Sequence, residues 1–79
     1  MTHQGYSTKL VLANGEANIS NPGVLLGSVC IGNDISVIEV ANALGVTRQT
    51  IYNWFTGKVT PTPRAEQKIK QFIEELNRE

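Results

Sequence analysis

The sequence predicts a small all-α domain of about four helices, preceded by an N-terminal arm or a short β-hairpin. Its 79 residues allow one domain with a single core. From residue 21 onward, helix-capping residues precede each apolar run, and glycine follows several of them. Residues 1–20 are more polar and bury little surface by themselves. We therefore expect an N-terminal segment, residues 1–20, and a helical domain, residues 21–79.

Within the N-terminal segment, apolar and polar residues alternate weakly around the pair Asn14-Gly15. Both residues tolerate positive φ, so the pair favours the type I′ turn of a hairpin. Such a hairpin would join residues 8–12 to residues 16–19. The alternative is a mobile arm, because an isolated two-stranded hairpin is marginally stable in water.

The first predicted helix begins after Asn21, an N-cap residue, with Pro22 at its first position. Gly32 is its natural end. Helical spacing predicts an apolar face made of Leu25, Leu26, Val29 and Cys30. The chain has one cysteine, which cannot form an intrachain disulfide, so we expect a buried thiol.

The second predicted helix starts with Ser36 and Glu39, a capping-box pattern, and runs to about residue 44, where Gly45 ends it. Glu39 and Asn42 should point outward. The inward face comprises four apolar residues, namely Val37, Val40, Ala41 and Leu44.

The third predicted helix is capped by Thr47, and its apolar residues Ile51, Trp54 and Phe55 follow the spacing of one buried helix face. Trp54 could also be a stacking platform for unpaired bases, but its place in this pattern favours the core. Gly57 closes the helix.

The fourth predicted helix follows the extended segment KVTPTP, with Thr62 as its cap and Pro63 at its start. It carries a continuous apolar stripe of Ala65, Ile69, Phe72, Ile73 and Leu76. This stripe serves either the core or contact with a second copy of the chain.

Charge is distributed unevenly, although the formal net charge is zero. Residues 47–70 contain five basic side chains and one acidic side chain, whereas acidic residues exceed basic ones on both sides of this block. Such a positive block is typical of nucleic-acid binding. Within it, Arg64, Lys68 and Lys70 are equally well explained as the solvated face of a helix.

Other functions find little support in the residue types present. His3 is the sole histidine, so with one cysteine the sequence offers no zinc set. No nucleophile and base pattern appears, and we expect neither enzymatic activity nor a cofactor. No run approaches the roughly 20 apolar residues of a membrane span, and no secretory signal is evident, so we expect a cytoplasmic protein.

The stretch DISVIEVANALGVTRQTIYNWFTGKVTP, residues 34–61, resembles the helix-turn-helix of the phage Cro/cI repressor family, also called the XRE family. The motif itself spans residues 36–57. Its features are a small residue at Ala41, Gly45 four residues later, flanking core positions, and the exit Gly-Lys followed by a proline. The resemblance extends more loosely over residues 22–76. Family members usually carry five helices, one more than we expect here.

The resemblance implies that the third helix lies in the DNA major groove. Residues that would contact bases are Arg48, Gln49, Tyr52 and Asn53. Residues that would contact the DNA backbone or a thymine methyl are Thr47, Thr50, Thr56, Lys58 and Thr60. The alternative is that these side chains merely form the wet face of an amphipathic helix, with Lys58 a solvated lysine favoured by the helix dipole.

The family further implies a sequence-specific regulator of transcription from a phage or mobile element, acting on double-stranded DNA. A homodimer on an inverted-repeat operator is expected, because one recognition helix reads only a few base pairs. The alternative is an adaptor with the same fold that binds a protein such as a polymerase, toxin or nuclease.

Overall fold

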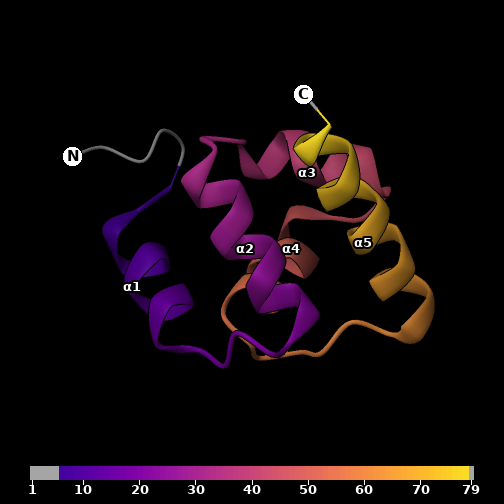
Figure 1. Cartoon of the computed structure of the whole chain (residues 1–79). Coiled ribbons are helices and arrows are strands. Elements are labelled where there is room, and N and C mark those ends of the chain that lie inside the picture. The colour runs from indigo at the N-terminus through magenta and orange to yellow at the C-terminus, as the bar shows by residue number, and fades with distance from the viewer. Residues whose placement is uncertain (1–5, 79) are drawn as a thin grey trace.

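The computed structural model describes residues 6–78, which form five α-helices and no strand. In chain order these are α1 (Thr8–Glu16), α2 (Pro22–Gly32), α3 (Val37–Leu44), α4 (Arg48–Phe55) and α5 (Pro63–Asn77) (Figure 1). The predicted all-α class is confirmed, and the described part of the chain has one helix more than expected. The additional helix is α1.

The predicted N-caps are confirmed at the helices that follow residue 20. Asn21 Oδ1 accepts from the Gly23 amide at 2.9 Å, and Ser36 Oγ accepts from the Glu39 amide at 3.1 Å. Thr47 and Thr62 cap α4 and α5 in the same way. Each cap satisfies an amide that has no partner inside its own helix, so the helix starts follow from local sequence.

The hairpin predicted around Asn14-Gly15 is wrong, because residues 8–16 form α1. Ser7 caps this helix, with its Oγ accepting from the Leu10 amide at 3.1 Å. Asn14 is not at a turn but buried, and its side chain donates to two backbone carbonyls of other helices. Local turn preference is therefore overridden by tertiary hydrogen bonds, and Tyr6, Leu10 and Val11 pack on the core instead of belonging to an arm.

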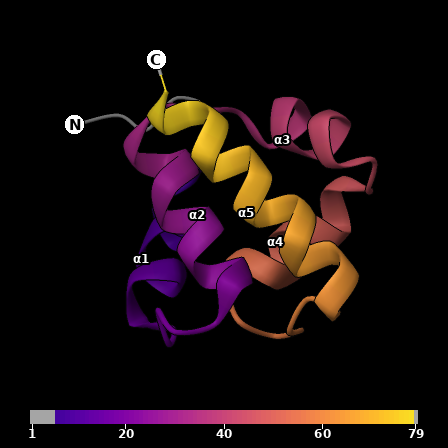
Figure 2. The ribbon, with the colours of Figure 1, turned by 45° about the vertical axis from the view of Figure 1, so that its right-hand side comes forward.

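The burial predicted for α2 is only partly correct. Leu26 and Cys30 are fully buried, but Leu25 is exposed, and Val24 and Ile31 are buried instead. Figure 2 shows α2 between α1 and α5, and it also contacts α4. A helix enclosed by three neighbours is buried on several sides, so no single apolar stripe describes it.

Two glycines of α2 allow α4 to pack closely against it. A Cβ atom on Gly23 would lie 2.7 Å from the Trp54 Cβ, and one on Gly27 would lie 2.8 Å from the Phe55 Cγ. Both distances are too short for any side chain. Trp54 and Phe55 are themselves buried, which confirms that the tryptophan belongs to the core.

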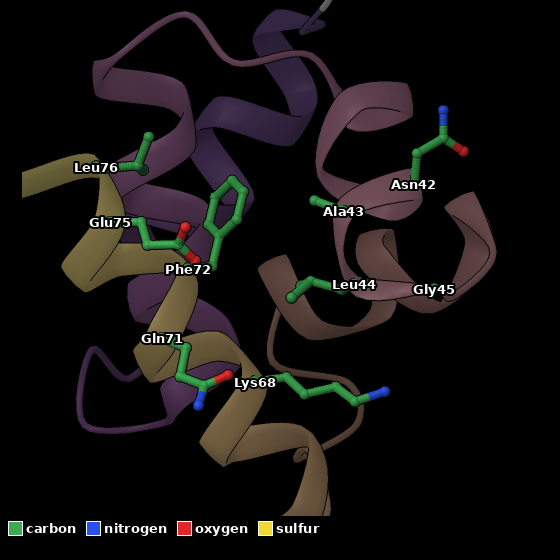
Figure 3. Close-up of a pocket in the computed structure, with 9 residues that line it drawn as sticks. All are labelled: Asn42, Ala43, Leu44, Gly45, Lys68, Gln71, Phe72, Glu75 and Leu76. Carbon is green, nitrogen blue, oxygen red and sulfur yellow. The ribbon is translucent and has the colours of Figure 1, made fainter. Parts of the chain in front are cut away.

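The apolar stripe of α5 is divided between the core and a surface groove. Ile69 is buried, whereas Phe72, Ile73 and Leu76 are half-buried at the edge of the core. Phe72 extends from α5 toward α3 in the groove between the two helices (Figure 3). Part of the stripe therefore remains accessible to solvent.

Candidate nucleic-acid interface

The site is built on a sharp bend between α3 and α4. Gly45 adopts φ 71°, the left-handed conformation that glycine tolerates best. Its amide donates to the Asn42 carbonyl at 3.3 Å, and the Val46 amide donates to the Ala41 carbonyl at 3.0 Å. These bonds satisfy the last carbonyls of α3 while the chain changes direction. The predicted turn is thus present at the predicted glycine.

Side chains from both helices fix the angle of this bend. The inward residues of α3 are buried as predicted, and Glu39 and Asn42 are exposed. Ile51 and Trp54 of α4 belong to the same core cluster, and Val46 packs against it from the turn. Because these side chains pack together in the interior, α4 is held in position and its opposite side faces solvent.

We call the outward side of α4 the recognition ridge, which consists of Arg48, Gln49, Tyr52 and Asn53. Arg48, Gln49 and Tyr52 are exposed and Asn53 is half-buried. Arg48 and Gln49 lie in the first turn of α4, and the helix contains no acidic residue. The exposure expected of Arg48, Gln49 and Tyr52 is thus present, that of Asn53 is partial, and α4 repels no phosphate through a carboxylate.

Within the ridge, Gln49 Nε2 donates to Asn53 Oδ1 at 3.2 Å. This i,i+4 bond aligns two amide groups on one side of the helix. It leaves the Gln49 carbonyl as an acceptor and the Asn53 amino group as a donor. Those are the two groups that match the N6 and N7 positions of adenine in the major groove.

The threonines predicted to contact the DNA backbone already take part in hydrogen bonds within the protein. Thr47 and Thr50 share a bond of 3.0 Å between their hydroxyls at the start of α4. Thr56 donates its hydroxyl to the Tyr52 carbonyl at 2.8 Å, whereas the Thr60 hydroxyl accepts from Asn21 at 3.3 Å. The Thr60 proton therefore remains available for another acceptor, while that of Thr56 is engaged.

The remaining cations lie after α4. Lys58 is exposed and lines a hollow together with Tyr52 and Thr56. On α5, the Lys70 ammonium lies 3.5 Å from a Glu66 carboxylate oxygen in an exposed i,i+4 pair. Such a pair contributes little to stability. Lys58 thus shares a hollow with Tyr52 of the recognition ridge.

Sequence reasoning missed the residues that attach α1 to the end of α4. Asn14 Nδ2 donates to the Phe55 carbonyl at 2.7 Å and to the Val24 carbonyl at 3.1 Å. The Tyr6 ring stacks on the Phe55 ring with centroids 6.1 Å apart, and its hydroxyl donates to the Ile35 carbonyl. Burial raises the pKa of this phenol well above its usual value. The helical spacing of Leu10, Asn14 and Ala17 is the one signal that could have indicated this attachment.

Residues 6–78 contain no group of three potential metal ligands and no helix long and apolar enough to cross a membrane. His3 lies outside the described residues. Cys30 is buried in α2, as expected, and burial raises the pKa of its thiol to about 12.

The bend, the packed helix pair and the exposed ridge define a helix-turn-helix protein. A family model described as helix-turn-helix matches residues 31–76, which is more than half of the chain. The chain therefore belongs to this family, the XRE type, which comprises DNA-binding domains and not enzymes. No curated protein and no solved structure matches the chain.

The family match confirms the resemblance found around residues 34–61 and identifies the protein as a DNA-binding regulator of the XRE type. It begins at the end of α2 and continues into α5. α1 lies entirely outside it, although α1 is attached to the recognition helix α4.

Proposed function

We propose that the protein is a sequence-specific regulator of transcription that binds an operator in double-stranded DNA. The observation that carries this proposal is the recognition ridge, where polar side chains able to read bases project from a helix fixed by a packed bend. The described residues of α1 meet α4 near Tyr52 and Thr56, while Arg48 and Gln49 remain exposed. The ridge is therefore open where a helix-turn-helix reads DNA.

In this proposal α4 lies in the major groove. Arg48 pairs with a guanine through two donors, and the linked amides of Gln49 and Asn53 meet an adenine. Each such pair contributes roughly 1–3 kcal/mol of discrimination against a wrong base. Tyr52 contacts a neighbouring base, and the backbone contacts come from Thr47, Thr50, Lys58 and Thr60. Thr56 joins them only by giving up the hydroxyl bond that it donates to the Tyr52 carbonyl.

We further infer that two copies bind together. One recognition helix contacts too few base pairs to specify a single site in a genome. A two-fold dimer places two recognition helices about 34 Å apart on an inverted repeat. The half-buried Phe72 and Leu76 in the groove between α3 and α5 are a candidate contact (Figure 3). The family resemblance supports a phage or mobile-element regulator that acts in the cytoplasm of a bacterial host.

Selection of bound duplexes from a random DNA pool tests the specificity and the symmetry together. We expect enrichment of two inverted half-sites with centres about 10 base pairs apart. Enrichment of a single half-site would contradict the dimer. A pool without enrichment would contradict sequence-specific binding.

A double variant tests whether the ridge carries the recognition. Replacing Arg48 and Gln49 by alanine removes two base-reading side chains, so we expect the affinity for the selected duplex to fall by about 30-fold or more. The matched control, Gln67→Ala with Arg78→Ala, removes the same two residue types from exposed positions near α5. Unchanged binding by the ridge variant would contradict base reading by the ridge. Absence of duplex binding by the wild type would favour the adaptor function, in which a protein partner takes the place of DNA.

A further inference from the structure

We propose that α1 is a second DNA-binding element, in which Lys9 and Lys58 together hold the phosphate backbone beside the groove read by α4. This inference rests on the proposed function. It concerns a helix outside the family match, so the properties of the family do not supply it.

α1 is attached to the recognition helix at two points. Tyr6, just before α1, stacks on the Phe55 ring, and Asn14, in the last turns of α1, donates to the Phe55 carbonyl. Asn14 and Tyr6 are both buried. Because one residue at the end of α4 anchors both, the two helices keep a fixed position relative to each other when either contacts a ligand.

This arrangement creates a hollow between the two helices. Ser7, Lys9 and Leu10 line it from the side of α1, and Tyr52, Thr56 and Lys58 line it from the side of α4. Tyr52 is also a member of the recognition ridge, so the hollow is continuous with the surface that reads bases. A duplex bound along α4 would bring its backbone to this hollow.

Charge indicates which part of a duplex the hollow would meet. Both lysines are exposed, and none of the described residues that line the hollow is acidic. Glu16, the single carboxylate of α1, lies at the opposite end of the helix. Two ammonium groups without a carboxylate partner favour phosphate oxygens, which release counterions when they are neutralised. Because the net charge of the chain is zero, these two lysines would supply a larger share of its attraction to DNA.

The test is the salt dependence of binding to a fluorescein-labelled 30-base-pair duplex of mixed sequence, measured by anisotropy with the full chain. For Lys9→Gln we expect the slope of log K against log salt to become shallower by about 0.9, and affinity near 0.1 M salt to fall roughly five- to tenfold. Lys58→Gln should behave alike, and Lys9→Arg should bind as the wild type does. Lys9 is exposed, so these variants keep the fold, which far-UV circular dichroism verifies.

Lys70→Gln is the matched control, because it removes the same charge from an exposed helix position where the lysine already pairs with Glu66. We expect its slope to equal that of the wild type. An equal loss in Lys70→Gln and Lys9→Gln would show a general charge effect and overturn the role of α1. Wild-type slope in Lys9→Gln would also overturn it but leave the proposed function intact. If the wild type binds neither this duplex nor any duplex from the random pool, the proposed function itself fails.

Discussion

The α3–α4 pair and α1 are held in place in different ways. α3 and α4 are joined by a short turn, and the turn bonds connect residues three to five positions apart. α1 is joined to the rest by Tyr6 and Asn14, whose bonds reach 29 and 41 residues along the chain. The geometry of the α3–α4 pair is thus set locally, while the position of α1 depends on two side chains whose partners are distant in the sequence. The two regions should respond differently to substitution.

Phe55 takes part in both attachments of α1, through Tyr6 and through Asn14. Its replacement should therefore have the largest effect on stability. Phe55→Ala empties a fully buried site in the core and removes the ring on which Tyr6 stacks. We expect the free energy of unfolding to fall by about 3–5 kcal/mol. Urea denaturation measures this. Tyr52→Ala, one turn earlier and exposed, should change stability by less than about 1 kcal/mol.

Asn14→Ala should affect α1 and the α3–α4 pair differently. It removes the donor to the Phe55 carbonyl and should cost about 1–3 kcal/mol. Hydrogen exchange should accelerate for the amides of α1, while those of α3 and α4 keep their protection. Asn42→Ala, an exposed position in α3, serves as the control with little loss of stability. Uniform acceleration in all helices would show that α1 is not a separable unit.

The local turn can be tested at Gly45. Nothing lies within 4 Å of a Cβ placed there, so the cost of Gly45→Ala is the left-handed backbone, about 1–2 kcal/mol. Gly15 in α1 has equally open surroundings but lies in a helix, so Gly15→Ala should stabilise by about 0.5–1 kcal/mol. Thermal denaturation should therefore shift in opposite directions for the two variants.

Alkaline pH should weaken the fold through two buried acids. The pKa of Cys30 is raised from 9.0 to about 12 in the folded chain, and that of Tyr6 is raised as well. Above pH 9 the unfolded chain therefore loses protons that the folded chain keeps, so stability falls as pH rises from 9 toward 12. From the thiol alone we expect a loss of about 1 kcal/mol at pH 10, which Cys30→Ala should abolish in urea denaturation.

Local sequence signals were sufficient to predict the α3–α4 pair and the caps of α2 to α5. Caps, a glycine at the turn and helical spacing act within a few residues, so they can be read without the fold. The exposure of Arg48 and Gln49 followed from the same spacing. Their contacts with bases stay a prediction, which the binding experiments address.

Two features could not be predicted because they depend on neighbours distant in sequence. Asn14-Gly15 has the composition of a turn, and the carbonyls of Val24 and Phe55 explain why the Asn14 side chain is buried within a helix. Likewise, the exposed Leu25 and buried Val24 follow from three helices packing around α2. Periodicity alone describes a helix with one buried face, and α2 has several.

The glycine pair of α2 has a consequence for how this protein can change its target. Because Gly23 and Gly27 bring Trp54 and Phe55 against the backbone of α2, any roll or lift of α4 to suit another sequence would break this close contact. New specificity must therefore come from exchanging the outward side chains of α4, while the position of α4 against α2 stays the same. In the proposed dimer, grafting four different residues at positions 48, 49, 52 and 53 should thus change the sequence of each half-site while the spacing of the half-sites stays the same.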